Sequence, residues 1–476
     1  MPARATLPPG PRYPALIQFV GFWTRPLAFL ERCRALYGPR FTIRLPATPP
    51  FVMITNPEEI KEIFTAPADV LAPGRGARVL EPVVGSASVI LLDGKAHIEQ
   101  RRLMLAAFHG ERMARLANLV GAVAEQEIRA WPTDRALELH PLFQRLTLEV
   151  ILRAVFGLDP GPRLDALREK LQAMLAFGDR PISLMPPPLD SRMARLLERV
   201  GPFAAFWRMR QEADELTFAQ LAERRREQRE SPEQHGRRED VLAMLLEARH
   251  EDGSEMSSDE LRDELLTLLV AGHETTASSL AWALQCLCHN PGVMEQLRAE
   301  VDADQDKEPY LLATIQETLR HRPVLPNVAP RFVLESITVG GFHYPSGVCL
   351  VPNGYLVHHD PACYPEPYAF RPQRFLERPP GTYTWIPFGG GRRRCLGASF
   401  ALLEMKLVLR AIVRSRYPRP ARDRIELPRR RNITIRPALG GRASLPPRRN
   451  GAAPSNAAPQ TTPAPALAGT ITAEEE

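Results

Sequence analysis

The chain has 476 residues, of which 44% are hydrophobic and 24% charged, with a formal net charge of +6 and an isoelectric point near 9.1. These values are ordinary for a soluble globular protein, and the basic residues lie in short scattered clusters, which argues against nucleic-acid binding. The 48 prolines, about twice the usual share, indicate long ordered loops between helices.

The N-terminal sequence MPARATLPPGPRYP has no apolar stretch of the kind that a signal peptide needs. The stretch that follows, ALIQFVGFW, is far shorter than the roughly 20 residues that span a bilayer. We therefore expect no transmembrane anchor, with shallow membrane contact as the alternative. The cysteines are too few and too irregularly spaced for a disulfide framework, which favours a cytoplasmic protein. They are Cys33, Cys286, Cys288, Cys349, Cys363 and Cys395.

Two short stretches have the residue types and alternation of β-strands. The first, FTIRLPATPPFVMITNP near residue 41, suits a hairpin, and the second, SITVGGFHYPSGVCLVPNG, begins near residue 336. Most of the remaining chain has helical periodicity. The sequence therefore predicts a mainly α-helical fold with a smaller β portion.

In the stretch GKAHIEQRRLMLAAF, His97 and Arg101 are four residues apart and so lie on one face of a predicted helix. Both side chains donate hydrogen bonds, and together they suit a carboxylate or a phosphate. A surface pair without a ligand is the alternative, which the spacing alone does not exclude.

The clearest helix begins at Ser257, which forms a predicted capping box with Glu260, and ends at Asn290. It spans about 32 residues, or roughly 48 Å, enough to cross a whole domain. Its second half is apolar on nearly all sides, so we expect it in the interior.

A polar cluster, AGHETT at residues 271–276, interrupts this apolar half. The small residues Ala271 and Gly272 allow a flat group to approach the backbone, although glycine costs about 1 kcal/mol of helix stability relative to alanine. One interpretation is a helix irregularity in which Thr275 bonds to a carbonyl four residues earlier. The other is a proton relay of Glu274 and Thr275 that opens onto a bound cofactor.

Glu317 and Arg320 lie three residues apart near the end of a helix that Pro323 terminates. The same spacing of glutamate and arginine recurs in the chain, so it proves nothing alone. The flanking leucines and isoleucine predict burial, where an ion pair persists only if a third group completes its hydrogen bonds. Arg374, in the stretch FRPQRF, is the candidate for that group.

Cys395 lies in FGGGRRRCLG, directly before a run with helical periodicity. At a helix N-terminus the exposed N–H groups and the dipole are expected to lower the pKa of the thiol below about 8.5. The three glycines permit a tight turn that brings backbone N–H groups close to the sulfur. The surrounding sequence offers no histidine base for a nucleophile and no companion ligands for zinc, whereas a single thiolate suits haem iron.

The segment FGGGRRRCLG resembles the haem-binding signature FxxGxRxCxG of the cytochrome P450 family. The other motifs follow in the family's order: the histidine and arginine pair, the AGxETT run, the glutamate and arginine pair, and the FxPxRF stretch. The similarity covers roughly residues 7–440 and points to soluble bacterial members. The matching signature positions are Phe388, Gly391, Arg393, Cys395 and Gly397.

The resemblance implies the cytochrome P450 fold, with haem b between the long central helix and the cysteine loop and with Cys395 as the axial thiolate ligand of iron. It implies that Glu274 and Thr275 deliver protons to dioxygen and that Ala271 and Gly272 leave room for it. The implied partners of the haem propionates are His97, Arg101, Arg331 and Arg393. The implied buried triad that fixes the cysteine loop is Glu317, Arg320 and Arg374. Gln373 replaces the acid that is usual before the last of these arginines.

By the same resemblance the chain is a haem-thiolate monooxygenase that inserts one oxygen atom from O2 into a hydrophobic small molecule. The segments that would wall the substrate pocket are rich in Leu, Val, Ile, Phe and Met, which suits a fatty acid, terpenoid, steroid or polyketide. The alternatives are a peroxide-dependent or isomerising haem-thiolate enzyme and a non-catalytic haem-binding sensor, which the retained acid and alcohol disfavour. The pocket segments are residues 73–90, 177–190, 269–273 and 324–328.

No flavin or iron–sulfur segment is recognisable, and Cys286 and Cys288 are expected in the core. Electrons are therefore expected from a separate protein, a ferredoxin or flavodoxin with its NAD(P)H reductase. Arg392 and Arg394 would contribute a basic surface for that acidic partner. We expect a monomer.

From residue 445 the sequence becomes rich in Pro, Ala, Thr and Ser, with almost no large apolar residue. Such a segment cannot bury enough surface to fold. No comparable linker and no repeat precede it. We therefore expect residues 1–444 to form a single domain and residues 445–476 to form a disordered tail.

Overall fold

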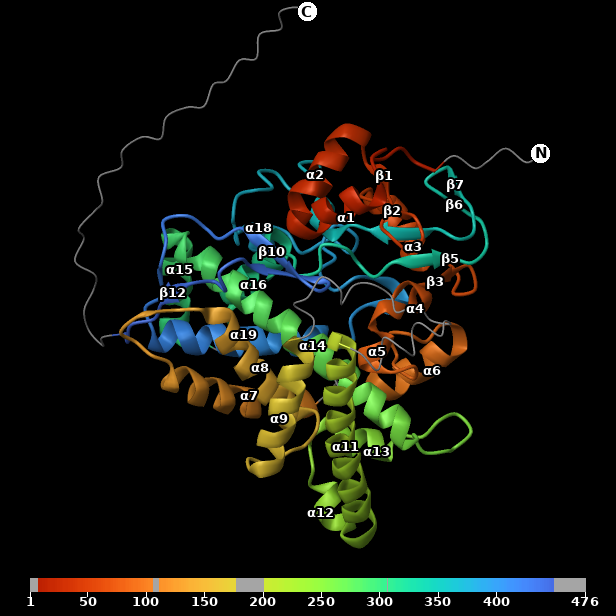
Figure 1. Cartoon of the computed structure of the whole chain (residues 1–476). Coiled ribbons are helices and arrows are strands. Elements are labelled where there is room, and N and C mark those ends of the chain that lie inside the picture. The colour runs from red at the N-terminus through yellow and green to blue at the C-terminus, as the bar shows by residue number, and fades with distance from the viewer. Residues whose placement is uncertain (1–6, 106–110, 177–200, 306, 449–476) are drawn as a thin grey trace, which may run out of the picture.

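The computed structural model describes residues 7–105, 111–176, 201–305 and 307–448. The fold is mainly helical with a smaller β portion, as predicted (Figure 1). The helices are α1 (Ala15–Thr24), α2 (Pro26–Tyr37), α3 (Pro57–Thr65), α4 (Pro73–Gly76), η1 (Arg78–Leu80), α5 (Glu81–Val84), α6 (Gly94–Leu105), α7 (Glu111–Ala130), α8 (Leu139–Ala154), α9 (Pro162–Ala176), α11 (Gly201–Glu230), α12 (Pro232–Gly236), α13 (Val241–Glu247), α14 (Ser258–Cys288), α15 (Pro291–Ala303), α16 (Pro309–His321), α17 (Gly354–His358), α18 (Arg374–Glu377), η5 (Gly391–Arg393) and α19 (Ala398–Ser415).

The strands are short and gather mostly in the upper part of the molecule in Figure 1. They are β1 (Arg40–Ile43), β2 (Phe51–Ile54), β3 (Leu71–Ala72), β4 (Ala136–Leu137), β5 (Arg331–Val333), β6 (Ile337–Val339), β7 (Phe342–Tyr344), β8 (Cys349–Pro352), β9 (Arg419–Pro420), β10 (Pro428–Arg431), β11 (Thr434–Pro437) and β12 (Ala443–Ser444).

A five-stranded sheet of order β1-β2-β8-β5-β3 organises the β portion. The predicted hairpin near residue 41 consists of β1 and β2, which pair antiparallel with Phe41 opposite Met53. The second predicted β stretch divides, because β6 and β7 form a separate hairpin whereas β8 pairs in parallel with β2. Strand β5 is thereby held between β8 and β3, and its first residue is the buried Arg331.

The long central helix α14 has the predicted capping box. The side chain of Ser257 accepts a hydrogen bond from the N–H of Glu260, and the Glu260 carboxylate accepts one from the N–H of Ser257. The helix ends at Cys288, close to the predicted stop. Helix α8 packs along it, and α16 and α19 also contact it. Because leucines from α14 belong to the largest hydrophobic cluster, the helix runs through the interior.

The cysteines agree with the sequence prediction, since all six are unpaired and Cys286 and Cys288 pack with the core of α14. Among the helices of the described ranges, none has the length and apolar content that a bilayer crossing requires.

The folded chain continues beyond the boundary expected after residue 444. Leu445 is fully buried, and the carbonyl of Pro446 accepts a hydrogen bond from the N–H of Tyr417 at 2.8 Å. Arg448 pairs with Asp302. The prediction of a tail from residue 445 is therefore wrong for its first four residues. The burial of Leu445, the hydrogen bond of Pro446 and the ion pair of Arg448 attach them to the segment after α19 and to α15. The rest of the expected tail, residues 449–476, lies outside the described residues.

Candidate functional site

Glycines shape the loop that carries Cys395. Gly389 and Gly391 have φ angles of +67° and +63°, in the left-handed region that favours glycine. A Cβ atom at Gly391 would lie 2.2 Å from the carbonyl oxygen of Phe64. The loop turns back on itself, so that the N–H of Cys395 donates to the carbonyl of Phe388 at 2.9 Å. The cysteine is therefore presented by a rigid turn.

The Cys395 side chain has accessible surface although much protein surrounds it, and it precedes α19 by three residues. Burial by the surrounding protein raises the pKa of its thiol, and the N–H of Gly397 and the charges of Arg101 and Arg394 lower it less. The prediction of a lowered pKa is thus wrong for the protein chain itself, because desolvation outweighs the helix N-terminus. A coordinated metal cation deprotonates such a thiol.

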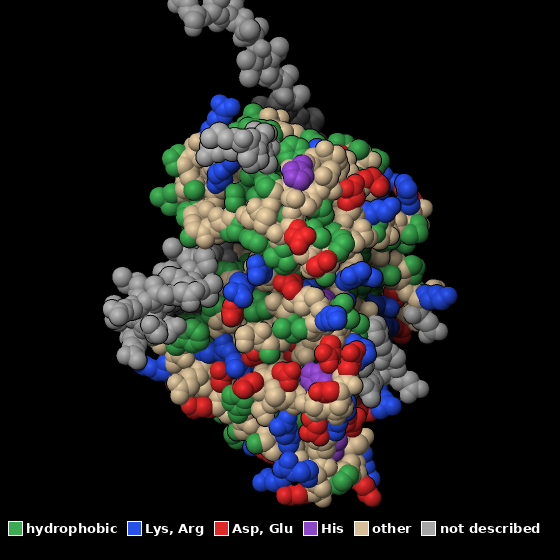
Figure 2. All heavy atoms as spheres, turned by 90° about the vertical axis from the view of Figure 1, so that its right-hand side faces the viewer, with side chains coloured by type: hydrophobic (Ala, Val, Ile, Leu, Met, Phe, Trp, Pro, Cys, Tyr) green, Lys and Arg blue, Asp and Glu red, His purple; other side chains and the backbone are tan. Residues whose placement is uncertain are grey.

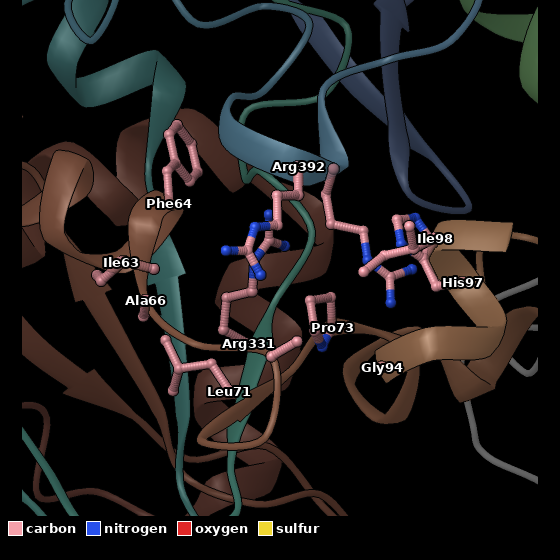
Figure 3. Close-up of a pocket in the computed structure, with 12 residues that line it drawn as sticks. Ile63, Phe64, Ala66, Leu71, Pro73, Gly94, His97, Ile98, Arg331 and Arg392 are labelled. Atoms are coloured by element: carbon pink, nitrogen blue, oxygen red, sulfur yellow. The ribbon is translucent and has the colours of Figure 1, made fainter. Parts of the chain in front are cut away.

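Positively charged side chains gather beside this loop. Burial, followed by the charges of Arg393, Arg101 and Arg331, lowers the pKa of His97 to about 3. His97 lines one pocket with Arg331, Arg392 and Arg393. Figure 3 shows the Arg331 and Arg392 side chains directed toward a common space, with His97 on the neighbouring helix. Arg101 lies close enough to Cys395 for the two charges to act on each other.

This cation cluster is short of negative charge. Burial and the charge of Arg393 lower the pKa of Arg331 to about 10, and burial lowers the pKa of Arg393 to about 10. Asp93 opposes both shifts, and its Oδ1 accepts a hydrogen bond from Arg393 at 2.7 Å. Several cations facing one carboxylate, in a partly desolvated pocket, suit an anionic group of a ligand.

The middle of α14 has an accessible position. Ala271 is exposed, although the residues around it on the helix are buried or half-buried. The hydroxyl of Thr275 donates to the Ala271 carbonyl at 2.5 Å, which is the back-bond of the first interpretation. Its oxygen can still accept a proton from another donor. Gly272 makes a different contact, because a Cβ atom there would lie 2.9 Å from Cδ1 of Ile151. Gly272 therefore allows α8 to approach α14 closely.

Polar side chains from α8, α14 and β10 hold the Glu274 carboxylate. Its Oε1 lies 3.1 Å from both Nε2 of His140 and the hydroxyl of Ser278. Its Oε2 accepts from Gln144 at 2.8 Å and from Arg431. Burial raises the pKa of Glu274, but the hydrogen bond of His140 and the charges of His140 and Arg431 outweigh it and hold the pKa at about 2. The carboxylate is therefore ionised at neutral pH.

Sequence patterns do not identify His140, Gln144 or Arg431 as partners of Glu274. They lie 134, 130 and 157 residues from Glu274 along the chain, so no local spacing connects them to it. Arg431 is the last of three consecutive arginines, and only its burial in the fold distinguishes it from Arg429. These residues can be recognised as partners of Glu274 only when it is known which elements pack on α14.

The structure brings Glu317, Arg320 and Arg374 together. Glu317 accepts from Arg320 at 2.7 and 2.9 Å and from Arg374 at 3.2 Å, with all three side chains buried. The remaining donors of Arg320 reach the carbonyls of His358, Pro367 and Ala369. The triad thus completes its hydrogen bonds, and it fixes the segment that leads to the cysteine loop.

Phe388 connects the cysteine loop to α16, the helix that carries Glu317 and Arg320. Its ring packs edge-on against Trp385, with 5.9 Å between the ring centroids. The indole N–H of Trp385 donates to the carbonyl of Gln316 on α16 at 3.2 Å. Gly397, in contrast, has open space where a side chain would begin.

Known proteins resemble this chain over nearly its whole length. The family model described as Cytochrome P450 matches residues 7–426. Cytochrome P450 135B1 of Mycobacterium tuberculosis is 37% identical over 470 residues, which cover 97% of this chain and 96% of the relative. Cytochrome P450 138 of Mycobacterium bovis is 34% identical over 448 residues, covering 93% and 97%.

A solved structure shows the same fold. The retinoic acid bound cyanobacterial CYP120A1 superposes with a TM-score of 0.75 at 23% identity, covering 93% of this chain and 100% of that chain. The family binds haem through a cysteine thiolate and uses O2 and a redox partner. The exposed cysteine and the anion-binding cluster beside it are chemically suited to such a cofactor. The chain belongs to the cytochrome P450 family and is a haem-binding monooxygenase.

Proposed function

We propose that Cys395 is the thiolate ligand of haem b and that the haem lies between α14 and the loop before α19. The observation that carries this assignment is exposure: Cys395 is exposed, whereas the other five cysteines are buried or half-buried. Burial raises the pKa of Cys33, Cys286 and Cys349 to about 11, 12 and 12, and it raises the pKa of Cys395 too, so accessibility rather than acidity distinguishes Cys395. When bound, the haem supplies dioxygen activation, which thiolate donation favours.

The cation cluster binds the haem propionates in this proposal. The assigned partners are His97, Arg101, Arg331 and Arg393. Neighbouring positive charges lower the pKa values of His97, Arg331 and Arg393, and the two propionate carboxylates would offset this effect. Arg392 lines the same pocket and is added to this set. Phe388 and Gly391 shape the loop around the cysteine, Gly397 follows it with open space beside its Cα, and the triad of Glu317, Arg320 and Arg374 holds the segment before it.

Thr275 and Glu274 move protons toward the accessible position at Ala271. The Thr275 hydroxyl donates to the Ala271 carbonyl. It can instead pass its proton on and be reprotonated by water, or by Glu274 once that carboxylate has taken up a proton. Glu274 reaches Thr275 only after exchanging some of its present partners, because four polar groups occupy its oxygens. Ala271 leaves the space for dioxygen, and Gly272 keeps the helix close to α8.

The substrate is a hydrophobic small molecule such as a fatty acid, terpenoid, steroid or polyketide, into which one oxygen atom is inserted. Leu269 is buried and Val324 nearly so, and residues 73–90 contribute further apolar side chains. The pocket segment expected at residues 177–190 lies outside the described residues. The related fold of CYP120A1 was solved with retinoic acid, which belongs to the same broad chemical class.

A ferredoxin or flavodoxin with its NAD(P)H reductase donates the electrons in this proposal. Arg392 and Arg394 are both exposed, and Arg394 is the stronger candidate for the docking surface because Arg392 also lines the pocket of Arg331. The six unpaired cysteines favour the cytoplasm, and the chain acts as a monomer.

Spectroscopy of the purified protein tests the ligand. The wild type, reduced and exposed to CO, should give the red-shifted Soret band that thiolate ligation produces, and Cys395→Ser should lose it. Cys363→Ser, a half-buried cysteine elsewhere, is the control and should keep the band. A thiolate band in Cys395→Ser would contradict the assignment. A blue shift of the oxidised Soret band on titration with hydrophobic compounds would then identify the substrate.

A further inference from the structure

The N-terminal helix α1 presents an exposed apolar face. Leu16, Ile17 and Val20 are 64%, 56% and 52% exposed, and Tyr13, just before the helix, is 42% exposed. Their spacing of three and four residues places them on one side of the helix. Single exposed apolar residues are ordinary on a protein surface, whereas a contiguous set marks an interaction site.

The opposite side of α1 is firmly attached to the protein. Gln18 donates to the carbonyls of Pro11 and Tyr13 at 3.1 and 2.9 Å, and it accepts from the N–H of Arg44 at 2.9 Å. Phe22 packs edge-on against Phe29, with 6.2 Å between the ring centroids. The helix therefore cannot roll over to bury the exposed side chains without losing these contacts.

The charged residues that flank α1 in the sequence are positive. Arg12 and Arg25 are exposed and bracket the helix, and no Asp or Glu precedes Glu31 in the sequence. Partly exposed Phe19 and Trp23, stacked with 6.1 Å between centroids, lie along the side of the helix. Apolar residues flanked by cations and aromatic rings suit the boundary between lipid headgroups and acyl chains.

We propose that the face of α1 formed by Tyr13, Leu16, Ile17 and Val20 docks on an anionic phospholipid surface. In this arrangement the four side chains enter the headgroup boundary while Arg12 and Arg25 contact lipid phosphates. The contact is shallow and reversible, because one short helix buries little apolar area. It does not depend on the assignments of the haem site.

A second copy of the chain fits this face poorly. The helix has ten residues and is about 15 Å long and about 10 Å across. One side of it offers far less than the ~800 Å² per partner that a stable protein interface buries. Two copies would also bring like charges together at Arg12 and Arg25.

The position of α1 supports lipid contact. Figure 1 places it in the upper, β-rich part of the molecule. In the view of Figure 2, from another side of the molecule, hydrophobic side chains are more frequent in the upper part than in the lower helical part, where charged ones dominate. The backbone of α1 also contacts β10, where Arg430 donates to the carbonyl of Phe22 at 3.2 Å. A docked α1 would thus hold the β-rich part toward the source of apolar compounds.

Flotation of the full-length holoprotein with vesicles tests the proposal. The probes are vesicles of phosphatidylcholine alone and of phosphatidylcholine mixed with phosphatidylglycerol. The wild type should bind the mixed vesicles about tenfold more tightly, and added salt should weaken that binding. Leu16→Gln with Ile17→Gln should weaken binding about tenfold or more, because two buried side chains are lost. Arg12→Gln with Arg25→Gln should remove the preference for the anionic lipid.

Leu376→Gln is the matched control, because Leu376 is also about half exposed but lies on α18. It should bind like the wild type, and thermal unfolding should show that all variants are folded. Equal binding by the wild type and the Leu16 and Ile17 double variant would overturn the proposal, as would equal affinity for both vesicles. Sedimentation that reveals a wild-type dimer, lost in the double variant, would overturn it in favour of a second copy.

Discussion

Glu274 in the middle of the central helix forms an ion pair with Arg431 at the end of β10, across 157 residues of sequence. Both side chains are largely shielded from solvent, and His140 lies on the same carboxylate. The pair ties a short C-terminal strand directly to the position proposed for proton delivery. The ionisation of Glu274 is therefore set by residues outside its own helix.

Replacement of Arg431 by Gln should raise the pKa of Glu274, because one of the charges that lower it is removed. A carboxylate with a folded pKa below its unfolded value stabilises the fold above the unfolded value and loses that contribution as pH falls. The free energy of unfolding of the variant should therefore be about 1.5–3 kcal/mol lower than that of the wild type at neutral pH. The difference should shrink as the pH falls from about 4.5 toward 2.

Urea unfolding at several pH values measures this difference. Arg429→Gln, at an exposed position of the same strand, is the control and should leave stability nearly unchanged. The pH dependence of substrate turnover in the Arg431 variant should also shift, because a raised pKa alters the fraction of ionised Glu274. An unchanged turnover profile together with unchanged stability would show that Arg431 does not govern Glu274.

Replacement of Gly391 by Ala should disturb the cysteine loop, whereas the same change at Gly397 should be tolerated. At Gly391 the φ angle is +63° and the new Cβ would lie 2.2 Å from the Phe64 carbonyl oxygen. At Gly397 the φ angle is −87° and no atom lies within 4 Å of the new Cβ. The first variant should lose about 1–3 kcal/mol from backbone strain alone.

The melting temperature and the amount of CO-bound thiolate band distinguish the two glycine variants. We expect Gly391→Ala to lower both, because the loop must move to relieve the contact with α3. If both variants behave alike, the rigid turn is not what presents Cys395.

Glu404 on α19 should make stability depend on pH in the opposite direction from Glu274. Burial raises its pKa to about 8, and the nearby hydroxyl of Thr276 on α14 opposes this only in part. In the unfolded chain Glu404 ionises near pH 4.5, whereas in the folded chain it stays protonated up to about pH 8. The free energy of unfolding should therefore fall between about pH 4.5 and 8, by about 1.4 kcal/mol per pH unit at most.

The variant Glu404→Gln should remove this dependence while keeping the shape of the side chain. Its free energy of unfolding, relative to the wild type, should rise with pH across the same range and then level off. A parallel pH dependence of the two proteins would mean that Glu404 is ionised in the folded state.

Local patterns account for what could be predicted from the sequence. The capping box at Ser257 and the stop at Asn290 depend on neighbouring residues, so α14 was found almost to the residue. The loop glycines and Cys395 lie within one ten-residue segment, whose turn follows from positive φ angles at fixed positions. The histidine and arginine spacing likewise placed His97 and Arg101 on one helix, α6.

What the sequence could not supply depends on distant packing. The pKa of Cys395 is raised because the surrounding protein desolvates it, which no helix-dipole argument includes. Gly272 faces Ile151, a contact that requires knowing that α8 packs on α14. Arg392 is exposed, as expected, but it also lines the pocket of Arg331, which only the path of the folded loop shows. Leu445 continues the fold because β12 and the end of α19 create a site for it.

Strand β10 has a consequence for the construction of chimaeras. Its adjacent residues Arg430 and Arg431 face different partners, the carbonyl of Phe22 on α1 and the carboxylate of Glu274 on α14. The region shared with the family model ends at residue 426, just before this strand. A crossover placed at that boundary would pair a foreign strand with Glu274. Exchange between relatives should therefore carry α1, α14 and β10 as one inherited unit.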